Sequence, residues 1–219
     1  MQIPAGGNPQ TTSVHRPTFE EIGIRDTIFY DVGFDMCWER FGLYGNAEID
    51  HMHGSSVLKE QLISHGVVLP PGTHIDVTAI FDWYKFGAMY GFRVKNCAIA
   101  PTFEVAVLDF GYYFRTSIED SRRSFRATTY RFGLKGEYDL SCATSLVFEG
   151  AFSIPHRLAI YDVSAKLAST FYENRCGRFD WFVGIGMTII DFEDRQEMPN
   201  HMQLRLYPIA TVGLSITFG

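Results

Sequence analysis

The sequence predicts an all-β protein that forms a single transmembrane, antiparallel, up-and-down β-barrel of about ten strands, with eight or twelve as alternatives. Apolar residues alternate with polar or small ones along most of the 219 residues, which is the period of a strand. The alternating segments are long, about 11–18 residues, whereas strands of soluble proteins cluster near ~5–6. Aromatic residues gather where these segments end.

Composition narrows the class of protein. Hydrophobic residues make up 46% and aromatic residues 15%, beside 20 Gly and 9 Pro, as in a turn-rich β protein. These values exclude disorder, collagen and a coiled coil. No run approaches the ~18 apolar residues of a membrane-spanning helix. The net charge of -6 gives a nucleic-acid partner no electrostatic support.

The expected strands follow from the alternation with period two. They cover 28–38, 41–49, 75–93, 98–114, 130–140, 145–154, 159–171, 179–189 and 202–218. In the last segment, the residues Met202, Leu204, Leu206, Pro208, Ala210, Val212, Leu214, Ile216 and Phe218 are expected on one face. Apolar residues change phase within 75–93 and within 98–114, and we expect a β-bulge in each.

The choice between a soluble and a membrane barrel depends on which face meets water. The polar face is rich in Gly, Ser, Thr and Ala, which suit a narrow polar lumen better than a water-exposed surface. The aromatic residues at strand ends suggest interfacial girdles. They are Trp38, Phe41, Tyr90, Phe92, Tyr112, Tyr113, Phe114, Tyr138, Tyr172, Phe179, Trp181 and Phe218. A soluble, lipocalin-like barrel is the alternative.

Connection lengths alternate along the chain. Short turns are expected near 39–41, 94–97, 140–143 and 174–178, and longer connections near 51–73, 115–123, 155–157 and 194–201. Outer-membrane barrels have short periplasmic turns and longer outer loops, so the first and last strands both run toward the periplasm. Antiparallel closure then needs another strand, for which Gln10 to Pro17 is the candidate. We expect 1–9 to be a periplasmic tail, 10–219 the barrel, and "SSVLKEQLISHG" a short helix.

The terminal "ATVGLSITFG" and the stretch "GVVLPPGTHIDVTAIFDWYKFGAMYGF" followed by "PTFEVAVLDFGYYF" carry a resemblance. With them the chain resembles the small outer-membrane β-barrel proteins of Gram-negative bacteria, across most of 26–219. The resemblance implies an outer-membrane location, a bilayer containing lipopolysaccharide, and the barrel-assembly machinery as a partner during biogenesis. That machinery reads a C-terminal Phe, whereas here Gly219 follows Phe218. Proteins of this family carry a signal peptide, and "MQIPAGGNPQ" does not resemble one. We therefore expect the sequence to be that of a mature form.

The four cysteines are expected at one rim of the barrel. Cys37, Cys97, Cys142 and Cys176 each lie in or beside a predicted short turn, which the topology places on the periplasmic side. Disulfides are permitted in that compartment. Neighbouring hairpin turns lie roughly 10 Å apart, beyond the usual Cα limit of ~7 Å, so both disulfides and free thiols are compatible with the sequence.

Charged residues of both signs are expected on the lumen face. They are Asp31, Asp35, Glu48, Asp82, Lys85, Arg93, Glu104, Arg131, Lys135, Glu137, Glu149, Asp162, Lys166, Asp180 and Arg205. Isolated buried charges are costly, so we expect these side chains to pair and fill the lumen as a plug. A narrow polar pore is the alternative.

Enzyme motifs are weak in this sequence. "GIGMTI" lacks a third glycine for a dinucleotide loop, and neither a P-loop nor a nucleophile elbow occurs. Histidines gather in predicted outer loops, where "HMH" at 51–53 is the strongest metal-like pattern; polar loop residues are the simpler explanation. We expect no metal, no cofactor and no catalytic residue.

The leading hypothesis for the function is a structural or interaction role through the outer loops. A narrow channel for small polar solutes or ions is second. A rim hydrolase using Asp50, His74, Asp76 and Asp109, of the protease or lipid A-modifying type, is third.

Overall fold

The computed structural model describes residues 18–25, 27–64, 67–154, 158–174, 177–193 and 201–218. Within these ranges the fold is all-β, which confirms the predicted class. The strands are β1 (Phe29–Trp38), β2 (Phe41–Val57), β3 (Leu62–Ser64), β4 (Val67–Leu69), β5 (His74–Tyr90), β6 (Phe92–Val94), β7 (Cys97–Thr116), β8 (Asp120–Asp139), β9 (Thr144–Ser153), β10 (Leu158–Asn174), β11 (Gly177–Glu193) and β12 (His201–Phe218).

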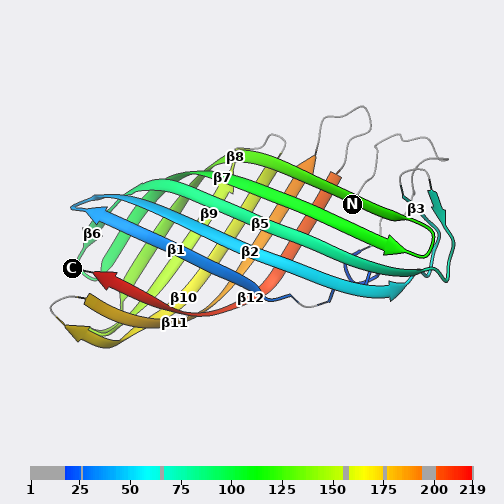
Figure 1. Ribbon diagram of the computed structural model, residues 1–219. Helices are drawn as coiled ribbons and strands as arrows, with labels where there is room; N and C mark the ends of the chain where they lie inside the picture. Colours follow the sequence, from blue (N-terminus) through cyan, green and yellow to red (C-terminus); the bar gives the residue numbers. More distant parts are fainter. Residues whose placement is uncertain are drawn as a thin grey trace.

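One curled antiparallel sheet holds every strand except the β3–β4 hairpin (Figure 1). The order is β1-β2-β5-β7-β8-β9-β10-β11-β12, and β6 continues the path of β5 along β7. The sheet curls far enough that Lys135 Nζ of β8 lies 3.2 Å from Asp35 Oδ1 of β1. The sheet therefore has an inner, concave face and an outer, convex face.

The two ends of the sheet differ. At one end, here called the turn end, short turns join β1 to β2, β6 to β7 and β8 to β9. The opposite end, the loop end, carries the β3–β4 hairpin and the β7–β8 turn. Because β1 and β12 both run toward the turn end, antiparallel closure needs one more strand. The candidate for it, Gln10 to Pro17, and the predicted tail 1–9 lie outside the described residues.

The prediction of one β-bulge in β5 and one in β7 is wrong. Pairing of β2 with β5, of β5 with β7 and of β7 with β8 proceeds residue by residue without a shift. Every second residue faces inward along the whole of β5, so Phe81, Trp83 and Lys85 all point to the inner face. The apolar set changes phase because apolar side chains lie on the inner face in the loop half and on the outer face in the turn half.

A register shift occurs instead in the C-terminal hairpin, where none was expected. Pairing of β11 with β12 slips between Gly186 and Thr188, which places an irregularity between Leu206 and Ile209. Leu204 and Leu206 therefore share the inner face with Thr211, while Ala210, Val212 and Leu214 lie on the outer face. The prediction of a single apolar face along this strand is wrong.

Two connections differ from the expected ones. Strands β7 and β8 extend to Thr116 and from Asp120, so a turn over 117–119 replaces the long connection expected at 115–123. Residues of the expected helix instead contribute to β2 and to β3, which pairs with β4 in a separate two-stranded sheet. Connections 155–157 and 194–200 lie outside the described residues.

Candidate functional site: the outer apolar band and the filled inner face

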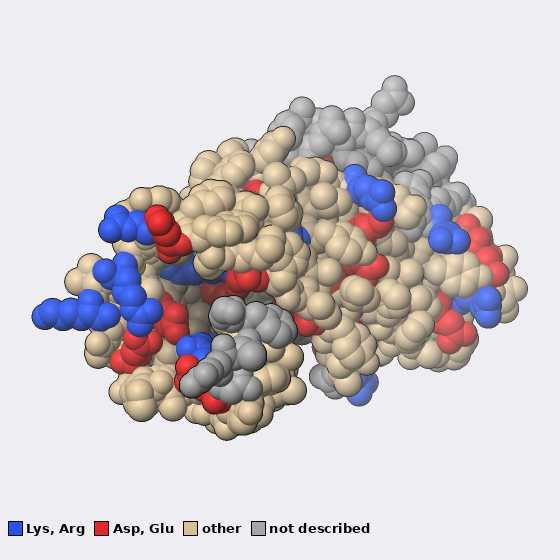
Figure 2. All heavy atoms as spheres, turned by 60° about the vertical axis from the view of Figure 1, so that its left-hand side comes forward, with Lys and Arg blue, Asp and Glu red and all other residues tan. Residues whose placement is uncertain are grey.

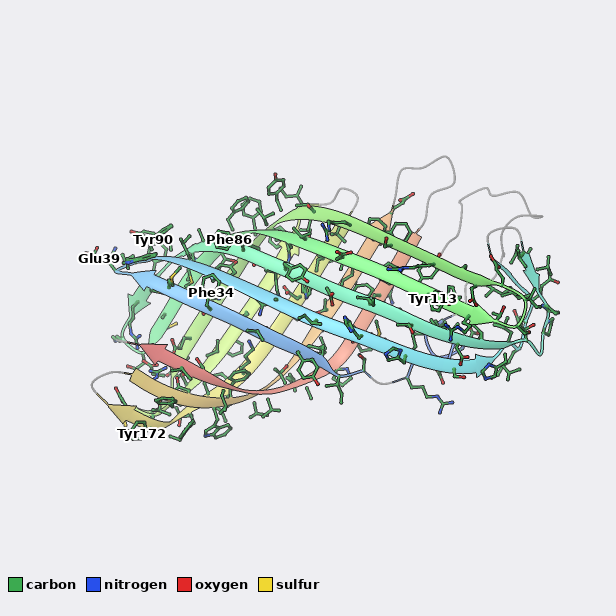
Figure 3. All side chains as sticks on the ribbon, viewed as in Figure 1. Phe34, Glu39, Phe86, Tyr90, Tyr113 and Tyr172 are labelled. Carbon is green, nitrogen blue, oxygen red and sulfur yellow. The ribbon has the colours of Figure 1, made fainter. Side chains whose placement is uncertain are left out.

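Apolar side chains cover the outer face of the turn half. Each long strand contributes an outward apolar run of about 9–11 residues, as Ile99 to Val107 do in β7 and Phe179 to Ile189 in β11. These side chains are well exposed: Phe86 by 55%, Leu134 by 52% and Val183 by 46%. Figure 3 shows Phe34 and Phe86 on neighbouring parts of this surface. Figure 2 shows Lys and Arg side chains mostly toward the two ends of the molecule, with Asp and Glu side chains also visible between them.

A ring of tyrosines borders this outer apolar band on its loop side. Every strand that runs toward the turn end supplies one outward tyrosine at this level, and all are 40% or more exposed: Tyr30, Tyr84, Tyr130, Tyr161 and Tyr207. The aromatic residues that the sequence predicted at strand ends did not include these five tyrosines. The turn-side border has Trp38, Tyr90, Tyr138 and Trp181, as expected. Tyr112 and Phe114, which were expected in a girdle, are instead buried on the inner face.

The inner face of the loop half is a packed apolar core. Its central rings are those of Phe81 and Phe110, whose centroids lie 4.8 Å apart, and Phe125, which stacks on Phe110 and tilts against Phe192. Ile75 and Ile160 are fully buried in the same cluster. These buried side chains occupy the inner face of the loop half.

Residues 18–25 contribute to this core at the loop end. Thr18 and Glu21 exchange side chain-to-backbone hydrogen bonds, which fix a tight turn. Ile22 and Ile24 are buried to 2% and 5% exposure. The backbone at Gly23 passes close to β2, since a Cβ on Gly54 would lie 2.7 Å from backbone atoms of Gly23 and Ile22. This N-terminal plug depends on the missing side chain at Gly54.

Replacing Gly54 with Ala should displace the N-terminal plug. Overpacking of this kind costs about 1–3 kcal/mol, and we expect a lower unfolding midpoint together with faster tryptic cleavage at Arg25. Gly136→Ala is the matched control, because the nearest atom to a Cβ there is 3.9 Å away. Equal protease resistance of both variants would show that the plug does not depend on this contact.

Below the apolar core, charged side chains fill the inner face of the turn half. At the centre of this ionic cluster is Arg131, with 0% exposure. Its Nη1 lies 2.5 Å from Glu104 Oε1, and its Nη2 donates to Asp162. Tyr44 donates to the other oxygen of Glu104 at 2.6 Å. The Arg131 guanidinium also lies 5.1 Å from the centre of the Trp83 ring. Two carboxylates and an aromatic face thus hold one buried cation.

Three lysines extend the ionic cluster toward the turn end. Lys85 Nζ lies 2.8 Å from Glu48, Lys166 Nζ 3.3 Å from Glu149, and Lys135 pairs with Asp35 across the sheet. The inner face therefore brings together most of the predicted lumen residues, namely Asp31, Asp35, Glu48, Lys85, Glu104, Arg131, Lys135, Glu137, Glu149, Asp162 and Lys166. Of these, Asp31 accepts a hydrogen bond from Asn46.

Two residues assigned to the lumen lie on the outer face. Asp82 pairs with Ile49 and Asp109 in the register of β5, and its carboxylate lies 3.6 Å from His51. Arg205 is exposed and pairs with Ile189, because the register shift in β12 reverses its facing. Neither side chain belongs to the ionic cluster.

The cysteines at the turn end that the structure describes are free. Cys37, Cys97 and Cys142 form no disulfide with one another, and Cys176 lies outside the described residues. Cys37 lies on β1, Cys97 begins β7, and Cys142 lies in the turn between β8 and β9.

The acidic and histidine residues proposed for a rim hydrolase do not form one cluster. Asp50 points inward from β2 and is 6% exposed. His74 and Asp76 lie on the outer face with 3.9 Å between His74 Nδ1 and Asp76 Oδ2, and Asp109 pairs with Arg126 on the outer face. Of the "HMH" pair, His53 Nδ1 lies 3.1 Å from Thr78 Oγ1. In the described chain, no three His, Cys, Asp or Glu side chains are grouped as metal ligands.

Comparison of the chain with protein-family models, with curated proteins and with solved structures finds no match. The described part of the chain contains no helix that is long and apolar enough to cross a membrane.

Proposed function

We propose that the chain is a bacterial outer-membrane β-barrel whose turn half spans the bilayer. The outer apolar band carries this proposal, because its runs of about 9–11 residues match the length of a membrane-spanning strand. Tyrosines on one border and Trp, Tyr and Phe on the other fit interfacial girdles. On this account lipid, including lipopolysaccharide, is the principal partner of the outer face, and the barrel-assembly machinery inserts the chain.

The proposed barrel closes between β1 and β12. Outward side chains on these two strands are among the most exposed of the apolar band, with Tyr30 and Val32 at 70% on β1 and Val212 at 82% on β12. Such exposure is expected where a neighbouring strand is missing. Because β1 and β12 run in the same direction, a tenth strand between them would make every contact antiparallel, and Gln10 to Pro17 is its candidate.

We propose that the barrel is plugged and acts through its loop end. Arg131 and its partners block the turn half, and the aromatic core and the N-terminal plug block the loop half. A filled interior favours a structural or interaction role, in which the β3–β4 hairpin and the β7–β8 turn offer the contact surface. The structure gives a solute channel no comparable support.

Planar-bilayer recording tests the plugged barrel. Purified protein inserted into a bilayer should give no discrete conductance steps, because charged and apolar side chains fill both halves of the interior. A porin inserted under the same conditions is the positive control, and protease protection of the inserted chain confirms insertion. Discrete openings of the inserted wild-type protein would support the channel instead.

A further inference from the structure

A serine, a histidine and an aspartate lie together on the outer face of the sheet at the loop end. Ser55 lies near the end of β2, and His74 and Asp76 lie at the start of β5, which pairs with β2 (Figure 1). Ser55 stands directly opposite Asp76 in the register, and His74 lies two residues from Asp76 on the same face. The pairing of two strands thus brings together a hydroxyl, an imidazole and a carboxylate.

The order of the contacts is the one that an activated serine needs. Ser55 Oγ lies 3.1 Å from His74 Nε2, and His74 Nδ1 lies 3.9 Å from Asp76 Oδ2. The first distance is that of a hydrogen bond, and the second is looser, as is common in catalytic sites before a substrate binds. One nitrogen of the imidazole therefore faces the nucleophile, and the other faces the group that orients the ring.

All three side chains can be reached from water. Those of His74 and Asp76 are 63% and 55% exposed, and Ser55 is exposed as well. Arg115, which is also exposed, lies directly opposite Asp76 on β7. Ser55, Asp76 and Arg115 thus form one row across three strands, and the guanidinium gives this row a positive charge that favours an oxyanion developing on the same face.

We propose that Ser55, His74 and Asp76 form a hydrolytic site for carboxylic esters. With His74 Nδ1–H directed to Asp76, Nε2 takes the proton of Ser55 as Oγ attacks the carbonyl carbon of the ester. The imidazolium gives this proton to the alcohol oxygen as the bond from that oxygen to carbon breaks, which leaves an acyl group on Ser55. Water then attacks the acyl carbon and gives a proton to Nε2, and this proton returns to Oγ as the carboxylic acid leaves.

The position of the site on the sheet indicates the class of ester, and this step rests on the proposed function. Asp76 precedes Tyr84 of the tyrosine ring by eight residues of β5, which is about 26 Å at ~3.3 Å per residue. A strand tilt of ~45° leaves roughly 18 Å above the ring, more than the ~5–8 Å of a headgroup layer. We therefore expect a water-soluble ester as the substrate, and not an ester of a bilayer lipid.

Covalent labelling with a fluorophosphonate, which reacts with activated serines, tests the site in neutral detergent. Mass spectrometry of peptides should show labelling of Ser55 at least tenfold faster than that of Ser124, an exposed serine on the outer face of β8. His74→Gln should slow labelling of Ser55 by about 10²-fold or more. His53→Gln is the matched control and should not, because His53 lies on the same face of β2 and contacts Thr78 instead. Labelling of Ser55 no faster than Ser124, or unchanged by His74→Gln, would overturn the proposal.

Ester turnover tests the substrate class. The wild-type protein should hydrolyse p-nitrophenyl butyrate at least tenfold faster than Ser55→Ala does, and in lipid vesicles it should release no fatty acid from the host phospholipid. Ser56→Ala, which changes the neighbouring inward serine, is the matched control and should keep the wild-type rate. Equal rates for wild type and Ser55→Ala would overturn the site, and fatty-acid release that Ser55→Ala abolishes would overturn the choice of a water-soluble ester. Bilayer recordings test the plugged barrel separately.

Discussion

Arg131→Met should lower the free energy of unfolding by about 3–5 kcal/mol, the range found when one partner of a buried ion pair is removed. The substitution keeps much of the side-chain volume but leaves Glu104 and Asp162 without their cation. Glu104 is 5% exposed, so water cannot replace the lost partner. Guanidinium unfolding followed by tryptophan fluorescence measures the effect, since Trp83 lies against the guanidinium.

Arg126→Met is the matched control for this prediction. Arg126 lies on the same strand and also pairs with an aspartate, Asp109, at 2.5 Å, but its side chain is 73% exposed on the outer face. Exposed ion pairs contribute about 0–1 kcal/mol, so this variant should unfold almost as the wild type does. Similar losses for both variants would show that the ionic cluster is not the buried centre of the fold.

Val183→Arg should destabilise the bilayer-inserted protein by about 2–4 kcal/mol, the cost of arginine near the midplane on the lipid face of a barrel. Val183 lies midway along the outward apolar run of β11. Folding into lipid vesicles at a series of urea concentrations, read from tryptophan fluorescence, measures the change. If this face met water, the substitution would fall within the ±0.5 kcal/mol usual for surface positions.

Thr128→Arg provides the comparison at a second depth. Thr128 is exposed on the outer face of β8, on the loop side of Tyr130, where the proposed bilayer has ended. We expect a change of at most about 1 kcal/mol there. A penalty at Thr128 equal to that at Val183 would contradict the assigned position of the bilayer.

Periodicity in the sequence identified the strands and most of their facing. It did not identify where the inner face changes from apolar side chains in the loop half to charged side chains in the turn half. In β5 and β7 the apolar set moves from the inner to the outer face at Trp83 and Leu108, and this gives the same sequence pattern as a bulge. In β12 the pattern misled in the opposite way. Apolar residues continue across a real register shift, so the sequence contains no sign of the shift. The shift places Arg205 on the outer face and not, as predicted, on the inner one.

The charged inner residues were largely predictable as a set, but their partners were not. Lys135 and Asp35 are one hundred residues apart, and only the curl of the sheet brings them together. The tyrosine ring had a usable signal, one tyrosine at the polar border of each strand that runs toward the turn end. It was missed because Tyr30 and Tyr161 read there as ordinary members of an alternating run.

Spin labels placed singly along residues 179–189 of β11, in a variant without native cysteines and in lipid vesicles, test the membrane assignment most directly. Labels at outward positions such as Val183 and Ile185 should be accessible to apolar oxygen and protected from a water-soluble nickel chelate, whereas a label at an inward position such as Phe182 should be protected from oxygen. High accessibility of Val183 and Ile185 to the nickel chelate would contradict the account, because the outer apolar band would then lie in water.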